Sequence, residues 1–304
     1  MNRTNVIHLL EKKINREYII EDEMMNKHTT FKVGGPADLY VIPRSEEELV
    51  YAIEVCKSEN VPYYVIGNGS NLLVTDKGFR GVIIEVYRQM SDITVEGNCI
   101  TAYAGALLSK IANTALEHGL TGLEFAHGIP GALGGAVTMN AGAYDGEMKQ
   151  VLESATVIDD KGQVRTLSSD ELELEYRKSI ISRLGYTVIK ATMRLEDGDK
   201  EAISAKMKDL MQRRRDKQPL EYPSAGSTFK RPVGHFAGKL IMDAGLRGYQ
   251  LGGAQVSEKH CGFVINKDHA TCQDILDLIH YIQEEVKSKF DVQIEPEVKM
   301  IGER

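Results

Sequence analysis

Apolar residues recur alternately at helical and at strand spacing along the chain, a pattern typical of a mixed α+β protein. Residues 36–88 predict strand, helix, strand, loop and strand, and the helix is expected to begin at a capping box formed by Ser45 and Glu48. Its apolar stripe consists of Leu49, Ile53 and Cys56. A short amphipathic helix is also expected at the N-terminus, with one side made of Val6, Leu9, Leu10 and Ile14.

The middle of the chain predicts a second group of strands and helices. A hairpin is expected to turn at residues 97–98, and an amphipathic helix over 107–116 is expected to end at Gly119. Further strands are predicted at 153–158 and 186–195.

The last third of the chain predicts a third group. A charged helix is expected over residues 201–217, followed by a linker at 218–223. Thr271 and Asp274 predict the start of another helix. Its apolar stripe consists of Ile275, Leu278, Ile279, Ile282 and Val286. A final strand is expected over residues 292–302.

A small polar loop interrupts the apolar residues between two extended segments. It consists of Gly67, Asn68, Gly69, Ser70 and Asn71. The loop matches neither G-x-x-x-x-G-K-[ST] nor the G-x-G-x-x-G fingerprint, which opens a helix, so a conventional Rossmann dehydrogenase is disfavoured. Its glycines would let backbone N–H groups surround an anion, and a plain turn explains the same residues equally well.

A second glycine-rich stretch, residues 128–147, is harder to explain as turn chemistry alone. Pro130 fixes a bend, the glycines from 131 to 135 permit close packing, and residues 140–143 form a wall of very small side chains. Such a wall suits a flat ring, and tight packing of a helix on a sheet would also explain it. Two glycine-rich loops in neighbouring groups favour a shared ligand.

Composition restricts the class of partner. The chain has 304 residues, of which 42% are hydrophobic and 27% charged, and its net charge is −7. No overall basic field would draw it to nucleic acid or anionic lipid. The longest uncharged stretch, residues 125–144, is too rich in glycine for a membrane span, and the N-terminus lacks the apolar run of a signal peptide. A small-molecule partner and a cytoplasmic location are therefore expected.

The four cysteines and eight histidines form no C-x-x-C, H-E-x-x-H or His-x-His pattern. Neither a metal site nor a disulfide framework is expected, and buried reduced thiols are the simpler interpretation.

Several polar residues have ordinary explanations when taken singly. Ser227 is typical of a turn or cap and lacks the G-x-S-x-G frame of a hydrolase. Arg177 and Glu297 are interpreted as an exposed strand arginine and an edge-strand carboxylate. The run 213–215 with Lys217 is typical of a solvated helix face, and at the mouth of a cleft it would instead bind a phosphorylated substrate.

Seven stretches, in their order and spacing, resemble the bacterial UDP-N-acetylenolpyruvoylglucosamine reductase family over nearly the whole chain. They are TFKVGGPADLYVIP (30–43), VIGNGSNLLV (65–74), GLEFAHGIPGALGGAVTMNAGAY (122–144), EYRKSI (175–180), SAGSTFKRP (224–232), AGKLIMDAGLRG (237–248) and EPEVKMIG (295–302). Members of this family have an α+β, FAD-binding fold of the p-cresol methylhydroxylase and vanillyl-alcohol oxidase type, which carries no dinucleotide fingerprint. The resemblance implies two FAD-binding subdomains, 1–88 and 89–217, the first completed by residues 291–304, and a C-terminal α+β substrate domain over 218–290.

The resemblance also implies the activity. It implies an NADPH-dependent oxidoreductase with non-covalent FAD that reduces UDP-N-acetylglucosamine enolpyruvate to UDP-N-acetylmuramate for peptidoglycan synthesis. Hydride would pass from flavin N5 to C3 of the substrate, and Ser227 matches the residue that gives a proton to C2. Arg177 and Glu297 match the pair that stabilises the enolic intermediate, Arg177 by its charge and Glu297 as a protonated donor.

Cofactor and substrate contacts follow from the same resemblance. Gly67 to Asn71 would contact the FAD pyrophosphate, and residues of the second loop would lie along the isoalloxazine. These are Gly128, Ile129, Pro130, Gly131, Gly134, Gly135, Asn140, Ala141 and Gly142. Lys217 matches a residue that contacts the substrate diphosphate. Arg231 stands where a family member has asparagine, and an arginine suits a phosphate.

The chain resembles the shorter form of this enzyme, which lacks an inserted tyrosine-bearing loop, and a monomer or weak homo-oligomer is expected. Two other functions remain open: a flavin oxidase or dehydrogenase of the same fold acting on a sugar or lactone, and a flavin- or nucleotide-binding protein without turnover. The trio Arg177, Ser227 and Glu297 argues against the oxidase.

Overall fold

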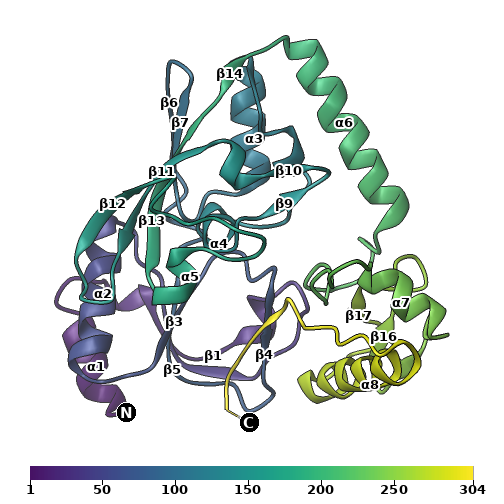
Figure 1. Cartoon of the computed structure of the whole chain (residues 1–304). Coiled ribbons are helices and arrows are strands. Elements are labelled where there is room, and N and C mark those ends of the chain that lie inside the picture. Colours follow the sequence, from purple (N-terminus) through teal and green to yellow (C-terminus); the bar gives the residue numbers. More distant parts are fainter. Residues whose placement is uncertain (304) are drawn as a thin grey trace. The chain divides into compact units, whose positions relative to one another are not determined.

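The computed structural model describes residues 1–303, which form two compact units (Figure 1). Unit 1 comprises residues 1–21, 39–68 and 81–213. Unit 2 comprises residues 22–38 and 69–80 together with the chain from residue 214 onward. Because this division follows compactness alone, the three-part division expected from the sequence stays a prediction.

One sheet, most of whose residues belong to unit 1, has the strand order β1-β2-β5-β3, with β3 and β5 parallel. Its strands are β1 (Ile19–Met24), β2 (Pro36–Val41), β5 (Phe79–Glu85) and β3 (Tyr63–Ile66). The helices α1 (Arg3–Leu10) and α2 (Glu46–Ser58) pack against each other, and the predicted stripes of both are buried or partly buried in the core.

The predicted capping box of α2 is formed only in part. The hydroxyl of Ser45 accepts a hydrogen bond from the Glu48 N–H at 3.2 Å, as expected. The Glu48 carboxylate, however, accepts from the backbone N–H of Arg44 at 2.9 Å and from its guanidinium at 2.8 Å. The Glu48 carboxylate therefore accepts from Arg44 and not from the Ser45 N–H, which a capping box would use. The reason is that the charged Arg44 offers two donors.

The second sheet of unit 1 is antiparallel, with the order β12-β11-β13-β7-β6. Its strands are β12 (Val164–Ser168), β11 (Leu152–Ile158), β13 (Thr187–Arg194), β7 (Cys99–Tyr103) and β6 (Ile93–Glu96). The hairpin and both strands expected from the sequence are confirmed. Strand β12 escaped prediction because it lies at the sheet edge, where only Leu167 is buried, and so it lacks an alternating apolar pattern.

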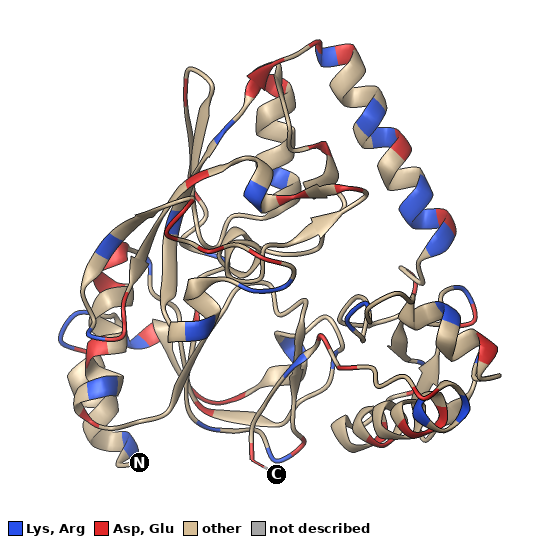
Figure 2. Ribbon diagram, in the orientation of Figure 1, with Lys and Arg blue, Asp and Glu red and all other residues tan. Residues whose placement is uncertain are grey.

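Helices and short strands complete unit 1 (Figure 1). The helices are α3 (Leu108–Glu117), α4 (Leu133–Thr138), α5 (Ile180–Leu184) and most of α6 (Lys200–Lys217). The short strands are β8 (Leu120–Thr121), β9 (Gly142–Ala143), β10 (Gly146–Glu147) and β14 (Glu196–Asp197). Lys and Arg residues are concentrated in the last turns of α6 (Figure 2).

Unit 2 is built around α8 (Cys272–Phe290), which packs on the sheet β15-β16-β17. Its other elements are α7 (Ala237–Asp243), β15 (Gln250–Leu251), β16 (Ala254–Val256), β17 (Val264–Asn266), β4 (Leu72–Val74) and β18 (Lys299–Ile301). The helix begins at the predicted capping box of Thr271 and Asp274, and the five residues of its predicted stripe are buried. The expected last strand is shorter than predicted, because only β18 forms a ladder, parallel to β4.

Within residues 1–303, no helix is long and apolar enough to cross a membrane.

Candidate active site

The two glycine-rich loops touch each other in unit 1. An added Cβ at Gly67, which directly follows β3, would lie 2.8 Å from the Cβ of Ala132. The side-chain amide of Asn68 donates to the carbonyl of Pro130 at 2.7 Å. The contact between residues 67–68 and 130–132 supports the expectation that both loops serve one ligand.

The loop after β3 offers backbone N–H groups that no other group of residues 1–303 accepts from. These are the amides of Asn68, Gly69 and Ser70. Gly69 has φ +59°, and an added Cβ would lie 2.0 Å from the carbonyl oxygen of His28, so no other residue fits there. Three successive donors without an acceptor suit an anion such as a pyrophosphate.

Two neighbouring glycines of α4 have different surroundings. An added Cβ at Gly134 would lie 2.9 Å from the Cβ of Ala104, so this glycine permits close packing. An added Cβ at Gly135 would meet no atom of the described residues within 4 Å. Gly135 therefore faces open space, as expected where the chain meets a ligand.

Further along the second loop, small residues serve packing inside the chain. An added Cβ at Gly142 would lie 2.6 Å from the carbonyl oxygen of Gly146, because β9 and β10 pair there. Ala141 is buried, and its N–H donates to Ala136 at 2.8 Å. Gly128, Ile129 and Gly131 are partly exposed in the loop before α4, while Pro130 is exposed.

His127 lies immediately before this loop, and one of its ring nitrogens is in an unusual environment. Its ring nitrogen Nδ1 is buried and has no hydrogen-bond partner within residues 1–303. Burial lowers the pKa of His127, so the ring is neutral near pH 7.

Arg177 lies in a tight turn, and the interpretation as a strand arginine is wrong. The N–H and C=O groups of Glu175 and Lys178 bond each other at 3.1 and 3.2 Å, with Tyr176 and Arg177 between them. Arg177 has φ +57°, a left-handed conformation that costs a residue with a Cβ about 1–2 kcal/mol. Its guanidinium lies 5.0 Å from the centre of the Tyr176 ring.

Ser227 and Glu297 belong to two segments that pair in unit 2. The Glu297 N–H donates to Thr228 at 2.8 Å, the Lys230 N–H donates to Glu295 at 2.9 Å, and an isolated bridge joins Phe229 to Pro296. Glu297 therefore lies opposite Thr228, the residue that follows Ser227 in the chain.

Both reactive groups on this pair of segments are accessible. Ser227 is exposed, and its hydroxyl makes only one contact with the rest of residues 1–303, a long one of 3.4 Å to the carbonyl of Phe229. Glu297 is half-buried, and its carbonyl accepts from the side chain of Asn71 at 3.4 Å. Asn71, the last residue of the first loop, thus contacts the segment that carries Glu297.

The two predicted phosphate-binding residues are exposed. Lys217 ends α6, and no hydrogen bond or ion pair joins its side chain to another of residues 1–303. The guanidinium of Arg231 lies 4.0 Å from the centre of the Phe236 ring. Of the arginines before Lys217, Arg213 pairs with Asp209 at 2.8 Å and Arg214 is buried.

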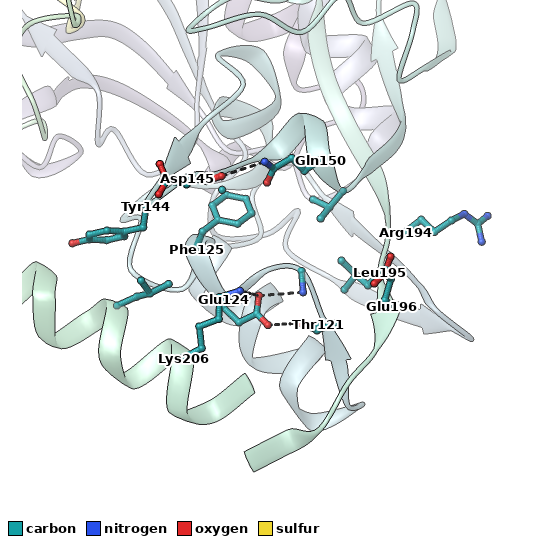
Figure 3. Close-up of a pocket in the computed structure, with 14 residues that line it drawn as sticks. Thr121, Glu124, Phe125, Tyr144, Asp145, Gln150, Arg194, Leu195, Glu196 and Lys206 are labelled. Carbon is teal, nitrogen blue, oxygen red and sulfur yellow. Dashed lines mark hydrogen bonds and ion pairs between the residues drawn. The ribbon is translucent and has the colours of Figure 1, made fainter. Parts of the chain in front are cut away.

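A pocket of about 480 Å³ lies beside α6 in unit 1, and none of the predicted site residues lines it (Figure 3). Lys206 of α6 approaches the buried carboxylate of Glu124 at 3.5 Å, and Phe125 and Tyr144 lie nearby. Because carboxylates and cations both line it, the pocket defines neither an anion site nor a cation site.

Comparison with known protein families finds two matching regions in this chain. A family model described as UDP-N-acetylenolpyruvoylglucosamine reductase, C-terminal domain, matches residues 218–301, and a model described as FAD binding domain matches residues 37–168. The fold and the site thus define an FAD-dependent oxidoreductase.

Individual relatives identify the family. UDP-N-acetylenolpyruvoylglucosamine reductase of Clostridium novyi (strain NT) is 55% identical over 294 residues, which cover 97% of this chain and 95% of that protein. Its counterpart in Clostridium botulinum (strain Hall) is 54% identical over 299 residues, covering 98% and 97%. The crystal structure of the Thermus caldophilus enzyme matches with a TM-score of 0.80 and 35% identity over 92% of this chain and 98% of that one. The chain belongs to the UDP-N-acetylenolpyruvoylglucosamine reductase family.

Membership confirms the fold, the cofactor and the activity expected from the sequence. The chain uses FAD and NADPH to reduce the enolpyruvyl group of a UDP-sugar, a step of peptidoglycan precursor synthesis. The residues present fit FAD, because the first loop offers free amides for a pyrophosphate and Gly135 borders open space for a ring.

Proposed function

We propose that Arg177, Ser227 and Glu297 carry out the reduction of the enolpyruvyl group. The observation that supports this most is the pairing in unit 2 of the segment that carries Ser227 with the segment that carries Glu297. Glu297 lies opposite Thr228, which directly follows the exposed Ser227. A proton donor and a hydrogen-bonding carboxyl group on adjacent segments can act on one small substrate group.

We further propose that two loops hold the FAD. The amides of residues 68–70, with Gly67 and Asn71, bind its pyrophosphate. The isoalloxazine would lie along the loop from Gly128 to Gly131, beside Gly134 and the open side of α4 at Gly135, and along residues 141 and 142. When bound, FAD accepts hydride from NADPH and delivers hydride to C3 of the enolpyruvyl substrate.

Ser227 donates the proton that C2 requires. A serine hydroxyl is a weak acid in water, but a substrate carbanion is a strong base, so geometry matters more than acidity. The hydroxyl is suited to this role because its one contact within the described part of the chain is long, at 3.4 Å. A serine committed to a short internal hydrogen bond would have to break it first.

Arg177 and Glu297 stabilise the negative charge that develops on the substrate between C2 and its carboxylate. The guanidinium acts by its charge, and Glu297 acts as a protonated donor. The left-handed backbone at Arg177 supports this role, because strained conformations of residues other than glycine concentrate at functional sites.

Lys217 and Arg231 are proposed to bind the substrate diphosphate, since both are exposed cations. We also propose that the enzyme works in the cytoplasm as a monomer or weak homo-oligomer, without a nucleic-acid or membrane partner. The location follows from its two substrates, a nucleotide sugar and NADPH.

Ser227→Ala tests the central assignment. Stopped-flow absorbance separates reduction of the bound flavin by NADPH from its reoxidation by the enolpyruvyl UDP-sugar. The variant should keep the first rate within about twofold and lose the second by at least about a hundredfold, within the range typical of a general acid.

Ser224→Ala is a suitable control, because it removes a hydroxyl three residues before Ser227. The hydrogen bond that Ser224 accepts from the Thr30 hydroxyl goes to its backbone carbonyl, which the substitution keeps. The control should behave like the unsubstituted enzyme in both half-reactions. Normal reoxidation in Ser227→Ala would exclude Ser227 as the proton donor.

A further inference from the structure

Asn140 follows α4 and is one of the most buried polar residues of unit 1. Its side chain is 1% exposed, and its backbone has φ +44°. Asparagine is among the few residues that adopt this left-handed conformation at modest cost. The residue is therefore held in one place by the surrounding chain.

Both amide protons of Asn140 are already used. The Nδ2 group donates to Glu147 Oε2 at 3.0 Å and to the carbonyl of Glu175 at 3.3 Å, and Oδ1 accepts from the Lys149 N–H at 2.9 Å. The chemistry of the partners fixes this orientation, because a carboxylate and a carbonyl can only accept while a backbone N–H can only donate. No side-chain donor is left for a flavin.

The contacts of Asn140 lead to the turn that carries Arg177. Besides the bond from Asn140 to the Glu175 carbonyl, Arg177 Nη1 approaches the Asn140 carbonyl at 3.5 Å. On the far side of the turn, the hydroxyl of Ser179 donates to the carbonyl of Thr138 at 2.6 Å. The end of α4 thus holds the turn on both sides of its strained residue.

We propose that Asn140 is a positioning residue for Arg177 rather than a ligand of FAD. The proposal rests on the role proposed above for Arg177. By holding the Glu175 carbonyl, Asn140 keeps the turn closed with Arg177 in its left-handed conformation and aims the guanidinium. Without this bond, the turn can relax to conformations that a residue with a Cβ prefers, and the guanidinium leaves its working position.

The test uses Asn140→Gly, because glycine accepts the left-handed backbone and removes only the side chain. If that variant fails to fold, Asn140→Asp keeps an oxygen for the Lys149 N–H and removes both donors. Gln150→Ala is the matched control, since Gln150 caps the same segment through Glu147 and Asp145 and makes no bond to the turn.

Three measurements separate the possible roles. Hydrogen exchange of the amides in residues 175–179 should accelerate about tenfold in Asn140→Gly and stay unchanged in Gln150→Ala. The Kd of the apoprotein for FAD and the rate of flavin reduction by NADPH should stay within about twofold. Flavin reoxidation by the enolpyruvyl UDP-sugar should slow about tenfold, which corresponds to about 1.4 kcal/mol.

A double-mutant cycle completes the test. In an Arg177→Ala background, Asn140→Gly should slow reoxidation no further, because its effect passes through Arg177. Unchanged exchange at 175–179, a tenfold weaker Kd for FAD, or a full additional loss in that background would overturn the inference. Faster exchange with normal reoxidation in Arg177→Ala would instead refute the proposed role of Arg177 and leave the positioning of the turn standing.

Discussion

Gly135→Ala is expected to stabilise the apoprotein and to lower its affinity for FAD. Gly135 lies inside α4, and an added Cβ would meet no atom of residues 1–303 within 4 Å. Alanine in a helix is favoured over glycine by about 0.8–1.0 kcal/mol. Without FAD, the variant should therefore be more stable by up to about 1 kcal/mol.

The same methyl group would project into the space assigned to the flavin. Overpacking a well-filled contact costs about 1–3 kcal/mol, which is roughly a 5- to 150-fold increase in the Kd for FAD. The two effects have opposite signs, and general damage to the fold cannot produce that combination.

The assay compares the apoprotein and its FAD complex. Chemical denaturation of the apoprotein gives the change in stability, and quenching of flavin fluorescence on titration gives the Kd. Gly134→Ala is the contrast, because its Cβ would lie 2.9 Å from Ala104 and should destabilise the apoprotein itself. A Gly135→Ala variant that binds FAD as tightly as the unsubstituted protein would refute the placement of the flavin on this side of α4.

Three more predictions concern stability and reactivity. Burial alone would raise the pKa of Glu124, but hydrogen bonds from Thr121 and backbone N–H groups, with the charge of Lys206, lower it overall. Glu124→Gln should therefore cost about 1–3 kcal/mol at pH 7 in denaturant titrations, with the deficit shrinking below about pH 4 as the carboxylate of the parent protonates; a constant deficit would contradict this. Thr228→Val should cost about 1–3 kcal/mol, since the buried Val264 N–H loses the acceptor that it contacts at 2.9 Å, and an unchanged denaturation midpoint would be the contrary result. Iodoacetamide at pH 8 should label only the half-exposed Cys99 in the native protein, because the other thiols are buried and burial raises the pKa of each; mass spectrometry showing a second native adduct would disagree.

Local chemistry explains which elements could be predicted from the sequence. The start of α8 was predictable because Thr271 and Asp274 satisfy each other's backbone groups within four residues. The loop at 67–71 was correctly placed between two strands, because the residues on both sides are apolar and favour extended structure.

Features that depend on distant contacts could not be predicted in this way. The turn at Arg177 was taken for a strand, because nothing in the letters of E-Y-R-K indicates that a non-glycine residue has positive φ. The glycines of the second loop look alike in sequence, yet Gly142 serves the pairing of β9 with β10 while Gly135 borders open space.

The pairing of the Ser227 and Glu297 segments is a further example. Thr228 and Glu297 are distant in sequence, and Pro296 argues locally against a strand. The resemblance to a known family, rather than any local pattern, gave the reason to consider these residues together.

An anaerobic titration of the purified protein tests the central claim most directly. NADPH should bleach the yellow of the bound flavin, and one equivalent of the enolpyruvyl UDP-sugar added without oxygen should restore it, with UDP-N-acetylmuramate formed in equal amount. A flavin that stays reduced until oxygen is admitted would contradict the account.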